Sequence, residues 1–211
     1  DAIPSEGELA ARFNVSQGTV RKAIDEMAAE NLLIRRQGKG TFVASHDDPR
    51  SFYRFLRLVP DDGNAAQAVS VPLSCSTKNA DAAVAAALGL KLGDPVIYVE
   101  RLLRFNGETV VFDQIHLVSD LFAGLTLESL SGGDRSLYSL FENDYGVRMI
   151  HAEEHLRAVA ADPYRAGLLA VPSGSPLLLV ERTAYTYGNK PVEWRRGLYC
   201  TSRHYYRNDL G

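Results

Sequence analysis

Two histidines and two glutamates stand close together at residues 151 to 155, in the order His-Ala-Glu-Glu-His. This H-x-x-E-H spacing is found in zinc peptidases, where both histidines lie on one face of a helix and bind one metal ion. The surrounding residues favour a strand instead, because Gly146 ends the preceding helix and Met149 and Ile150 begin a β-like run. In a strand the two imidazoles would lie ~13 Å apart, at ~3.3 Å per residue. We therefore predict no metal site and no cofactor.

Four charged residues stand in two segments that read as paired strands. Arg101 and Asp113 lie in the first segment, and Glu193 and Arg195 lie in the second, with Tyr199 four residues further on. A small-molecule pocket needs a few convergent polar groups in an apolar cleft, and these side chains could supply them. A salt bridge at a sheet edge explains the same residues equally well. Beyond these groups there is no acid–base constellation, so we predict binding rather than catalysis.

A third set of polar residues follows one face of the segment VSQGTVRKAIDEM, and consists of Ser16, Gln17, Gly18, Thr19, Arg21 and Lys22. A glutamine can read an adenine edge, and threonine and arginine can reach phosphates or base edges. Free amides at a helix start also suit a phosphate. The alternative interpretation is an ordinary solvated helix face.

The elements around this face predict a helix-turn-helix. Ser5 and Glu8 form an S-x-x-E capping box at a helix start, in which Leu9 and Phe13 face the same way, and Asn14 suits the stop. Ser16 then caps a second helix, whose expected buried stripe consists of Val20, Ala23, Ile24, Met27 and Ala28.

The next segment, LLIRRQGKGTFVA at residues 32–44, predicts a β-hairpin wing with QGKG as its turn. Its glycines do not have P-loop spacing. Residues 1–46 carry equal numbers of cations and anions, but Arg35, Arg36 and Lys39 extend the cations of the second helix. We therefore expect one basic face, with most acids elsewhere.

Residues 3–43 resemble the winged-helix DNA-binding domain of GntR-type bacterial transcriptional regulators, with P-S-E, then V-S-x-x-T-V-R, then a G-K-G-T-x-V wing. The resemblance implies that the second helix enters a major groove and that the wing approaches the DNA. The residues expected at DNA are Ser16, Gln17, Gly18, Thr19, Arg21, Lys22, Gln37, Gly38, Lys39 and Thr41.

Two residues depart from the family pattern. Where the family often has arginines that read guanine, this chain has Gly7 and Gln17. The resemblance therefore implies an operator that deviates from the usual GT…AC pattern, or weaker binding. The family domain also has one further helix before the residue equivalent to Asp1, so the DNA-binding domain is expected to be incomplete in this chain.

A polar, proline-containing segment at residues 47–52 predicts a linker, followed by a second domain with a diverged internal repeat. Gly-Asp-Pro at 93–95 and Gly-Ser-Pro at 174–176 begin the two copies, and Arg182 follows Arg101 by 81 residues. Each copy predicts a helix and an antiparallel hairpin, with turns at Asn106-Gly107 and Gly188-Asn189. A short helix at SLYSLFENDYG and a strand from VRMIHAEEHLRAVAA complete a sheet of about six strands.

This second part resembles the UTRA effector-binding domain, a chorismate-lyase-like fold found in the HutC subfamily of GntR regulators. The resemblance implies a ligand site formed by Arg101, Asp113, Ser136, Tyr138, Glu193, Arg195 and Tyr199. In sugar-phosphate-binding relatives a second arginine follows the first by two residues, but this chain has Leu103 there, and Arg104 points to the opposite face. A smaller carboxylate, amine or mixed-charge metabolite is therefore favoured over a sugar phosphate.

Composition sets the remaining limits. The chain has 211 residues, a formal net charge of −3 and 45% hydrophobic residues, which allows one or two domains. Cys75 and Cys200 are expected to be buried thiols rather than a disulfide, as in a reducing cytosol. No segment is long and apolar enough for a membrane span, and the chain does not start like a secretion signal, so we expect a cytoplasmic protein without membrane contact.

Together these patterns predict an α+β protein with a winged helix-turn-helix at 1–46, a linker at 47–52 and an effector-binding and dimerisation domain at 53–211. The expected function is a homodimeric regulator, most often a repressor in this family, that binds double-stranded operator DNA under control of a small-molecule effector. A chorismate-lyase-like enzyme and a metabolite sensor that lost DNA binding are the alternatives.

Overall fold

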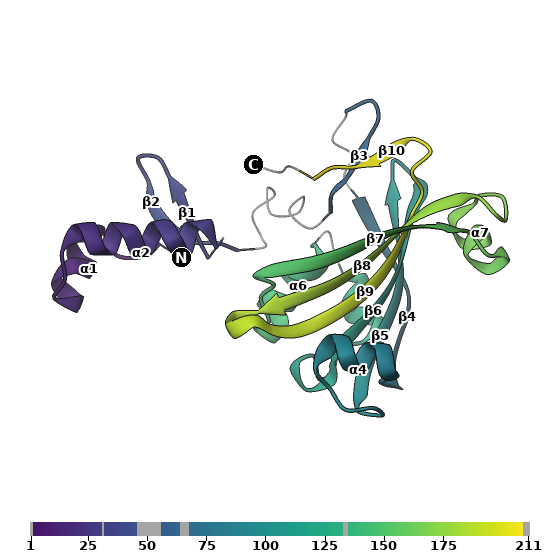
Figure 1. The fold of residues 1–211 in the computed structure, drawn as a ribbon, viewed down its shortest axis with the longest axis horizontal. Coiled ribbons are helices and arrows are strands. Elements are labelled where there is room, and N and C mark those ends of the chain that lie inside the picture. Colours follow the sequence, from purple (N-terminus) through teal and green to yellow (C-terminus); the bar gives the residue numbers. More distant parts are fainter. Residues whose placement is uncertain (1, 31, 46–55, 64–67, 133–134, 209–211) are drawn as a thin grey trace.

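The computed structural model describes residues 2–30, 32–45, 56–63, 68–132 and 135–208. The first part contains two helices and a two-stranded antiparallel hairpin: α1 (Glu6–Phe13), α2 (Gln17–Ala29), β1 (Leu33–Arg36) and β2 (Gly40–Val43). Residues 47–52, expected to be a linker, lie outside the described residues. The predicted helix-turn-helix and wing are therefore confirmed as elements (Figure 1).

Local side chains fix the helix ends, as the sequence predicted. Ser5 accepts a hydrogen bond from the backbone of Glu8, whose carboxylate accepts one from the backbone of Ser5, so the capping box is complete. Asn14 adopts the left-handed conformation that ends α1, with φ 52°. Ser16 then caps α2 through the amide of Thr19.

The predicted buried stripe of α2 was partly wrong. Val20 and Ile24 are buried on Ala10 and Leu33, but Met27 is 44% exposed. Ala23 is also exposed, and Phe13 points to solvent with 63% exposure. The small core of the described residues lies on the Val20 and Ile24 side of α2, so the rest of the expected stripe has nothing to pack against there.

The second part is built on a six-stranded antiparallel sheet with strand order β4-β5-β6-β9-β8-β7. Its strands are β4 (Ala68–Asn79), β5 (Pro95–Phe105), β6 (Glu108–Val118), β7 (His151–Ala160), β8 (Pro176–Thr186) and β9 (Lys190–Tyr199). Helix α4 (Ala82–Leu88) precedes β5, and α7 (Pro163–Leu169) precedes β8. The predicted repeat of a helix and an antiparallel hairpin is thus present twice, and in each copy a strand precedes the helix, β4 before α4 and β7 before α7. The two copies meet where β6 pairs with β9.

Helices cover both faces of this sheet, because alternate residues of each strand point to opposite sides. On one face α4 packs on Val96 and Val118, and α7 packs near Phe112 (Figure 1). On the other face α6 (Leu137–Tyr145) packs on Ile115 and Leu117. The described part of the chain also contains short helical segments: η1 (Ser119–Leu121), α5 (Leu127–Ser131) and η2 (Tyr187–Asn189).

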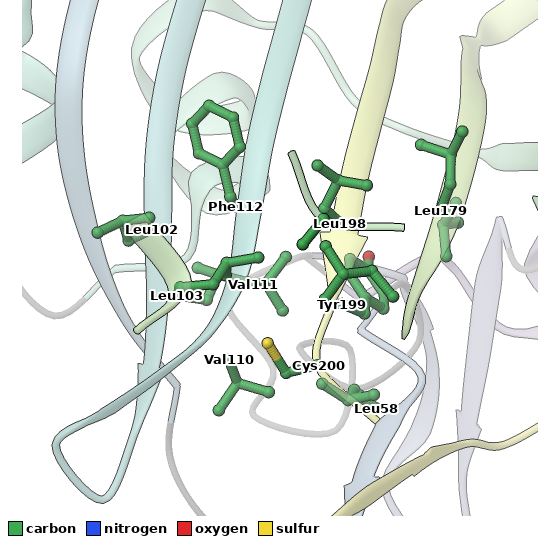
Figure 2. Close-up of a cluster of buried hydrophobic side chains, with 14 of the residues drawn as sticks. Leu58, Leu102, Leu103, Val110, Val111, Phe112, Leu179, Leu198, Tyr199 and Cys200 are labelled. Atoms are coloured by element: carbon green, nitrogen blue, oxygen red, sulfur yellow. The ribbon is translucent and has the colours of Figure 1, made fainter. Parts of the chain in front are cut away.

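One small sheet was not predicted. Strand β3 (Leu58–Pro60) pairs antiparallel with β10 (His204–Tyr206), which brings the start of the second part next to its end. Leu58 is 2% exposed and belongs to the same core as Tyr199 and Cys200, beside which Figure 2 shows it. This pair of strands is called the β3–β10 ribbon below.

Candidate functional site

The polar face of α2 is exposed over its first turns. The exposed residues surround the buried Val20 and are Ser16, Gln17, Gly18, Thr19, Arg21 and Lys22. The hydroxyls of Ser16 and Thr19 lie 2.9 Å apart. The helix start therefore presents side chains of the type that reads DNA, on a helix anchored by its apolar side.

The wing presents a second exposed set. Gln37, Gly38 and Lys39 form its exposed tip, and Thr41 is half-buried. The turn needs glycine because Gly38 and Gly40 have φ of 70° and 105°. The turn is closed by a hydrogen bond from the amide of Lys39 to the carbonyl of Arg36, at 2.9 Å.

Two of the acids lie against the arginines of the basic face. Arg21 donates to both carboxylate oxygens of Glu6, the shortest contact being 2.8 Å. Arg35 lies 2.7 Å from Asp25 and 3.9 Å from Glu6. The hydrogen bond from Arg21 also lowers the pKa of Glu6, so this acid stays ionised. These ion pairs link α1, α2 and β1. They also neutralise part of the positive charge of Arg21 and Arg35 on the face expected to bind DNA.

The charged residues of the second part form a buried cluster on the sheet face that carries α6. Arg101 and Arg195 share one oxygen of Asp113, at 2.9 and 3.1 Å. Arg195 also forms two hydrogen bonds to Glu193, each of 3.0 Å. All four side chains are at most 8% exposed. The structure therefore brings together four residues that the sequence placed in two separate hairpins.

Two tyrosines complete this part of the cluster. The hydroxyl of Tyr138, on α6, donates to Glu193 at 2.9 Å, and its ring lies 5.5 Å from the guanidinium of Arg195. Tyr199 is 2% exposed and passes so close to Gly197 that no Cβ fits there. Burial raises the pKa of both tyrosines to about 12, so both hydroxyls remain protonated donors.

Three further residues extend the cluster and were missed from the sequence. Arg182, 2% exposed, donates to Glu154 on β7 at 2.6 Å, and Glu154 accepts a second hydrogen bond from Tyr206 on β10. Arg182 is the repeat counterpart of Arg101, and this equivalence was the signal that could have found it. We use "charged cluster" for Arg101, Asp113, Glu154, Arg182, Glu193 and Arg195.

One acceptor in the cluster has no donor. Oδ1 of Asp113 is buried without a hydrogen-bond partner, although both arginines bind Oδ2. A buried carboxylate oxygen without a donor is costly, and such groups are informative exceptions in folded proteins.

Other predicted positions have different surroundings. Ser136 caps α6 by accepting from the amide of Ser139 at 3.1 Å, so its described role is at the helix start rather than in the charged cluster. Leu103 is buried and Arg104 is exposed, as the strand alternation predicted.

The H-x-x-E-H segment forms a strand, as predicted. His151 and His155 both lie on β7, and His151 stacks on Tyr185 with ring centroids 4.6 Å apart. Among the described residues there is no group of three or more potential metal ligands.

Cys75 and Cys200 are free thiols, half-buried and buried respectively. No helix in the described part of the chain is long and apolar enough to cross a membrane.

These features define a winged helix-turn-helix protein with an α+β domain that holds a buried charged cluster. The family models agree with both parts. The model for bacterial regulatory proteins of the gntR family matches residues 1–43, and the UTRA domain model matches residues 67–205. The chain therefore belongs to the GntR family of bacterial transcriptional regulators and carries a UTRA domain.

Two proteins of similar sequence are themselves named as transcriptional regulators. The HTH-type transcriptional regulator Rv0792c of Mycobacterium tuberculosis is 32% identical over 90% of this chain and 71% of its own length. The HTH-type transcriptional repressor PhnF of Mycolicibacterium smegmatis is 28% identical over 96% of this chain and 82% of its own. The protein is accordingly a transcriptional regulator, and the chorismate-lyase-like enzyme is set aside as an interpretation.

Solved structures show the same architecture. A ligand-binding domain from a protein assigned to the GntR-family regulators of Bordetella bronchiseptica is 48% identical, with a TM-score of 0.73 over 75% of this chain and 99% of that chain. PhnF from Mycobacterium smegmatis is 25% identical, with a TM-score of 0.62 over 100% of this chain and 92% of that chain.

Proposed function

We propose that this regulator is a cytoplasmic, homodimeric repressor whose affinity for operator DNA is set by a small molecule bound at the charged cluster. Residues 1–46 would bind DNA, and residues 53–211 would bind the effector and dimerise. Two half-sites ~34–36 Å apart would each receive one winged helix, so that the distance between the two heads controls affinity.

The DNA contacts proposed are those of the exposed face of α2 and the wing tip. Lys22 and Lys39 carry the proposal, since both are exposed and neither has an ion pair in the described structure. Gln17 at the helix start would read an adenine edge. Because Glu6 holds Arg21 through three donor–acceptor contacts, Arg21 would act as an oriented phosphate contact rather than as a mobile charge.

The effector site rests on a single observation: Asp113 lies buried between two arginines with one oxygen that has no donor. Burying five charged groups, with Glu154 half-buried beside them, costs more desolvation energy than an apolar core, which makes such a cluster a candidate for function rather than for stability. An effector that combines a carboxylate with an ammonium or hydroxyl would satisfy both Arg101 and this oxygen. The absence of an arginine at Leu103 disfavours a sugar phosphate.

The direct test uses the duplex that the protein itself selects from a random library, and measures binding by fluorescence anisotropy over a salt series. Lys39→Ala should weaken binding and lower the slope of log Kd against log salt by about 1, since one phosphate contact is lost. The matched control is Lys91→Ala, an exposed lysine in the second part, which should leave both quantities unchanged. Equal behaviour of the two variants would remove the wing from the interface.

The effector arm is a thermal-shift screen of small carboxylates, amines and sugar phosphates. A true ligand stabilises the folded protein by RT ln(1 + [L]/Kd), and a hit is then added to the protein–DNA complex. If no compound shifts the transition, the effector proposal loses its support. If the wild type selects no duplex at low salt, the sensor without DNA binding, suggested by Gly7 and Gln17, becomes the better interpretation.

A further inference from the structure

The β3–β10 ribbon joins the second part to the chain that leads to the winged helix. Strand β3 begins shortly after residues 46–55, which connect the two parts in sequence. Its partner β10 pairs Tyr206 with Leu58, and the amide of Arg207 donates to the carbonyl of Arg57 at 2.8 Å. Any displacement of β10 therefore moves the residues that directly follow the connection.

Tyr206 connects this ribbon to the charged cluster. Its hydroxyl donates to Oε2 of Glu154, while Oε1 of the same carboxylate accepts from Arg182 at 2.6 Å. The ring of Tyr206 lies beside that of Tyr199, with centroids 6.4 Å apart and an angle of 30° between the ring planes. Burial, with Glu154 as its acceptor, raises the pKa of Tyr206, so the hydroxyl is a protonated donor at neutral pH.

Arg182 links this contact to the effector residues. It pairs in register with Arg195 on β9 and with Glu154 on β7, so it lies between the two. Burial lowers the pKa of Arg182, but Tyr138, Tyr199 and Glu154 more than offset this and raise it well above its usual value. The guanidinium thus stays charged and needs a carboxylate at all times.

We infer that Tyr206 is a positioning residue that couples the occupancy of the charged cluster to the β3–β10 ribbon, and through it to the DNA-binding part. This inference rests on the proposed function. An anionic effector that binds Arg182 moves the guanidinium away from Glu154. The Glu154 side chain is only 14% exposed, so its carboxylate is then left without a cation in a largely buried position. Glu154 must reorient, and the Tyr206 hydroxyl bound to its other oxygen follows.

The Tyr206 side chain makes two contacts that can be tested separately: its hydroxyl bonds to Glu154, and its ring packs against Tyr199. Tyr206→Phe removes only the hydroxyl bond to Glu154, since the ring can keep its packing against Tyr199. Tyr205→Phe is the matched control: it makes the same chemical change on the neighbouring residue of β10, whose side chain is 45% exposed and has no hydrogen bond in the described structure.

The test is a double-mutant cycle that needs no identified effector, with Arg182→Lys as the perturbation of the cluster. Operator Kd is measured by anisotropy for full-length protein on the duplex selected by the wild type, with and without Tyr206→Phe. Arg182→Lys should change operator Kd by ~5-fold or more in the wild type and in Tyr205→Phe, but by less than ~2-fold in Tyr206→Phe. Melting temperatures are recorded for every variant, because a purely structural role would lower them without altering this ratio.

The outcomes separate the two proposals. If Arg182→Lys shifts Kd equally with and without the Tyr206 hydroxyl, or shifts it in neither background, the coupling is refuted while DNA binding stands. If the wild type binds no duplex, the proposed function itself fails. Should Arg182→Lys not fold, Glu154→Gln takes its place in the same cycle, since it keeps the side-chain volume and removes the charge that Arg182 pairs with.

Discussion

Gly197 offers a test of the packing beneath the charged cluster. It lies on β9 in register with Asp113 on β6 and Val180 on β8. A Cβ at this position would lie 2.6 Å from Cε1 of Tyr199 and 2.8 Å from Oδ1 of Asp113. Both neighbours are buried, at 2% and 0% exposure, so neither can move into solvent to make room.

Gly197→Ala should therefore destabilise the second part by about 1–3 kcal/mol, the usual cost of overpacking a buried site. The sign of the change in stability is informative. Where no clash occurs, replacing a strand glycine with alanine stabilises the fold by about 0.5–1 kcal/mol. For a chain of this size, 1 kcal/mol corresponds to about 2–4 °C in Tm, so a decrease of about 2–12 °C is expected.

The matched control is Gly167→Ala on α7, where nothing lies within 4 Å of the added carbon and the backbone is helical. This variant should be more stable than the wild type by about 0.5–1 kcal/mol. The assay is urea unfolding followed by tryptophan fluorescence. The chain has one tryptophan, Trp194, three residues from Gly197 on the same strand, so the signal reports this sheet. A Gly197→Ala protein as stable as Gly167→Ala would refute the packing of Tyr199 and Asp113 on this glycine.

Two other properties follow from the same structure. Tyr138 and Tyr199 have pKa values raised to about 12 by burial, against ~10 in an unfolded chain, so their contribution to stability is present below pH ~10 and is lost as the pH rises towards 12. Alkaline unfolding should therefore coincide with a cooperative rise in tyrosinate absorbance; ionisation of all tyrosines before loss of structure would contradict this. Ser16→Ala should cost the winged helix about 0.5–2 kcal/mol by removing the cap of α2, measured by helical circular dichroism on heating. An unchanged transition would show that the cap is dispensable.

Features set by near neighbours in sequence could be predicted, and features set by distant pairing could not. The capping box of Ser5 and Glu8, the cap at Ser16 and the stop at Gly146 each depend on residues within one turn. The hairpin turn at Asn106-Gly107 depends on two residues with positive φ. The β3–β10 ribbon, by contrast, joins segments more than 140 residues apart, and no local pattern marks it.

The charged cluster shows the same division. Arg101, Asp113, Glu193 and Arg195 could be proposed because each lies in a recognisable hairpin. Glu154 was considered only as part of a metal motif, since its pairing with Arg182 requires knowing that β7 is the neighbour of β8. Likewise the contact between Glu6 and Arg21 joins two different helices, α1 and α2, so no local pattern marks it.

The internal repeat explains why the charges gather where they do. Each copy places an arginine on its middle strand, Arg101 on β5 and Arg182 on β8, and the copies join through β6 and β9 between them. Asp113 and Glu193 on those two inner strands are therefore within reach of cations from both halves. A carboxylate at this junction serves two arginines, as Asp113 does, so a change at one arginine is felt by the other. The junction of the repeat is thus the place where one substitution affects both halves of the sheet at once.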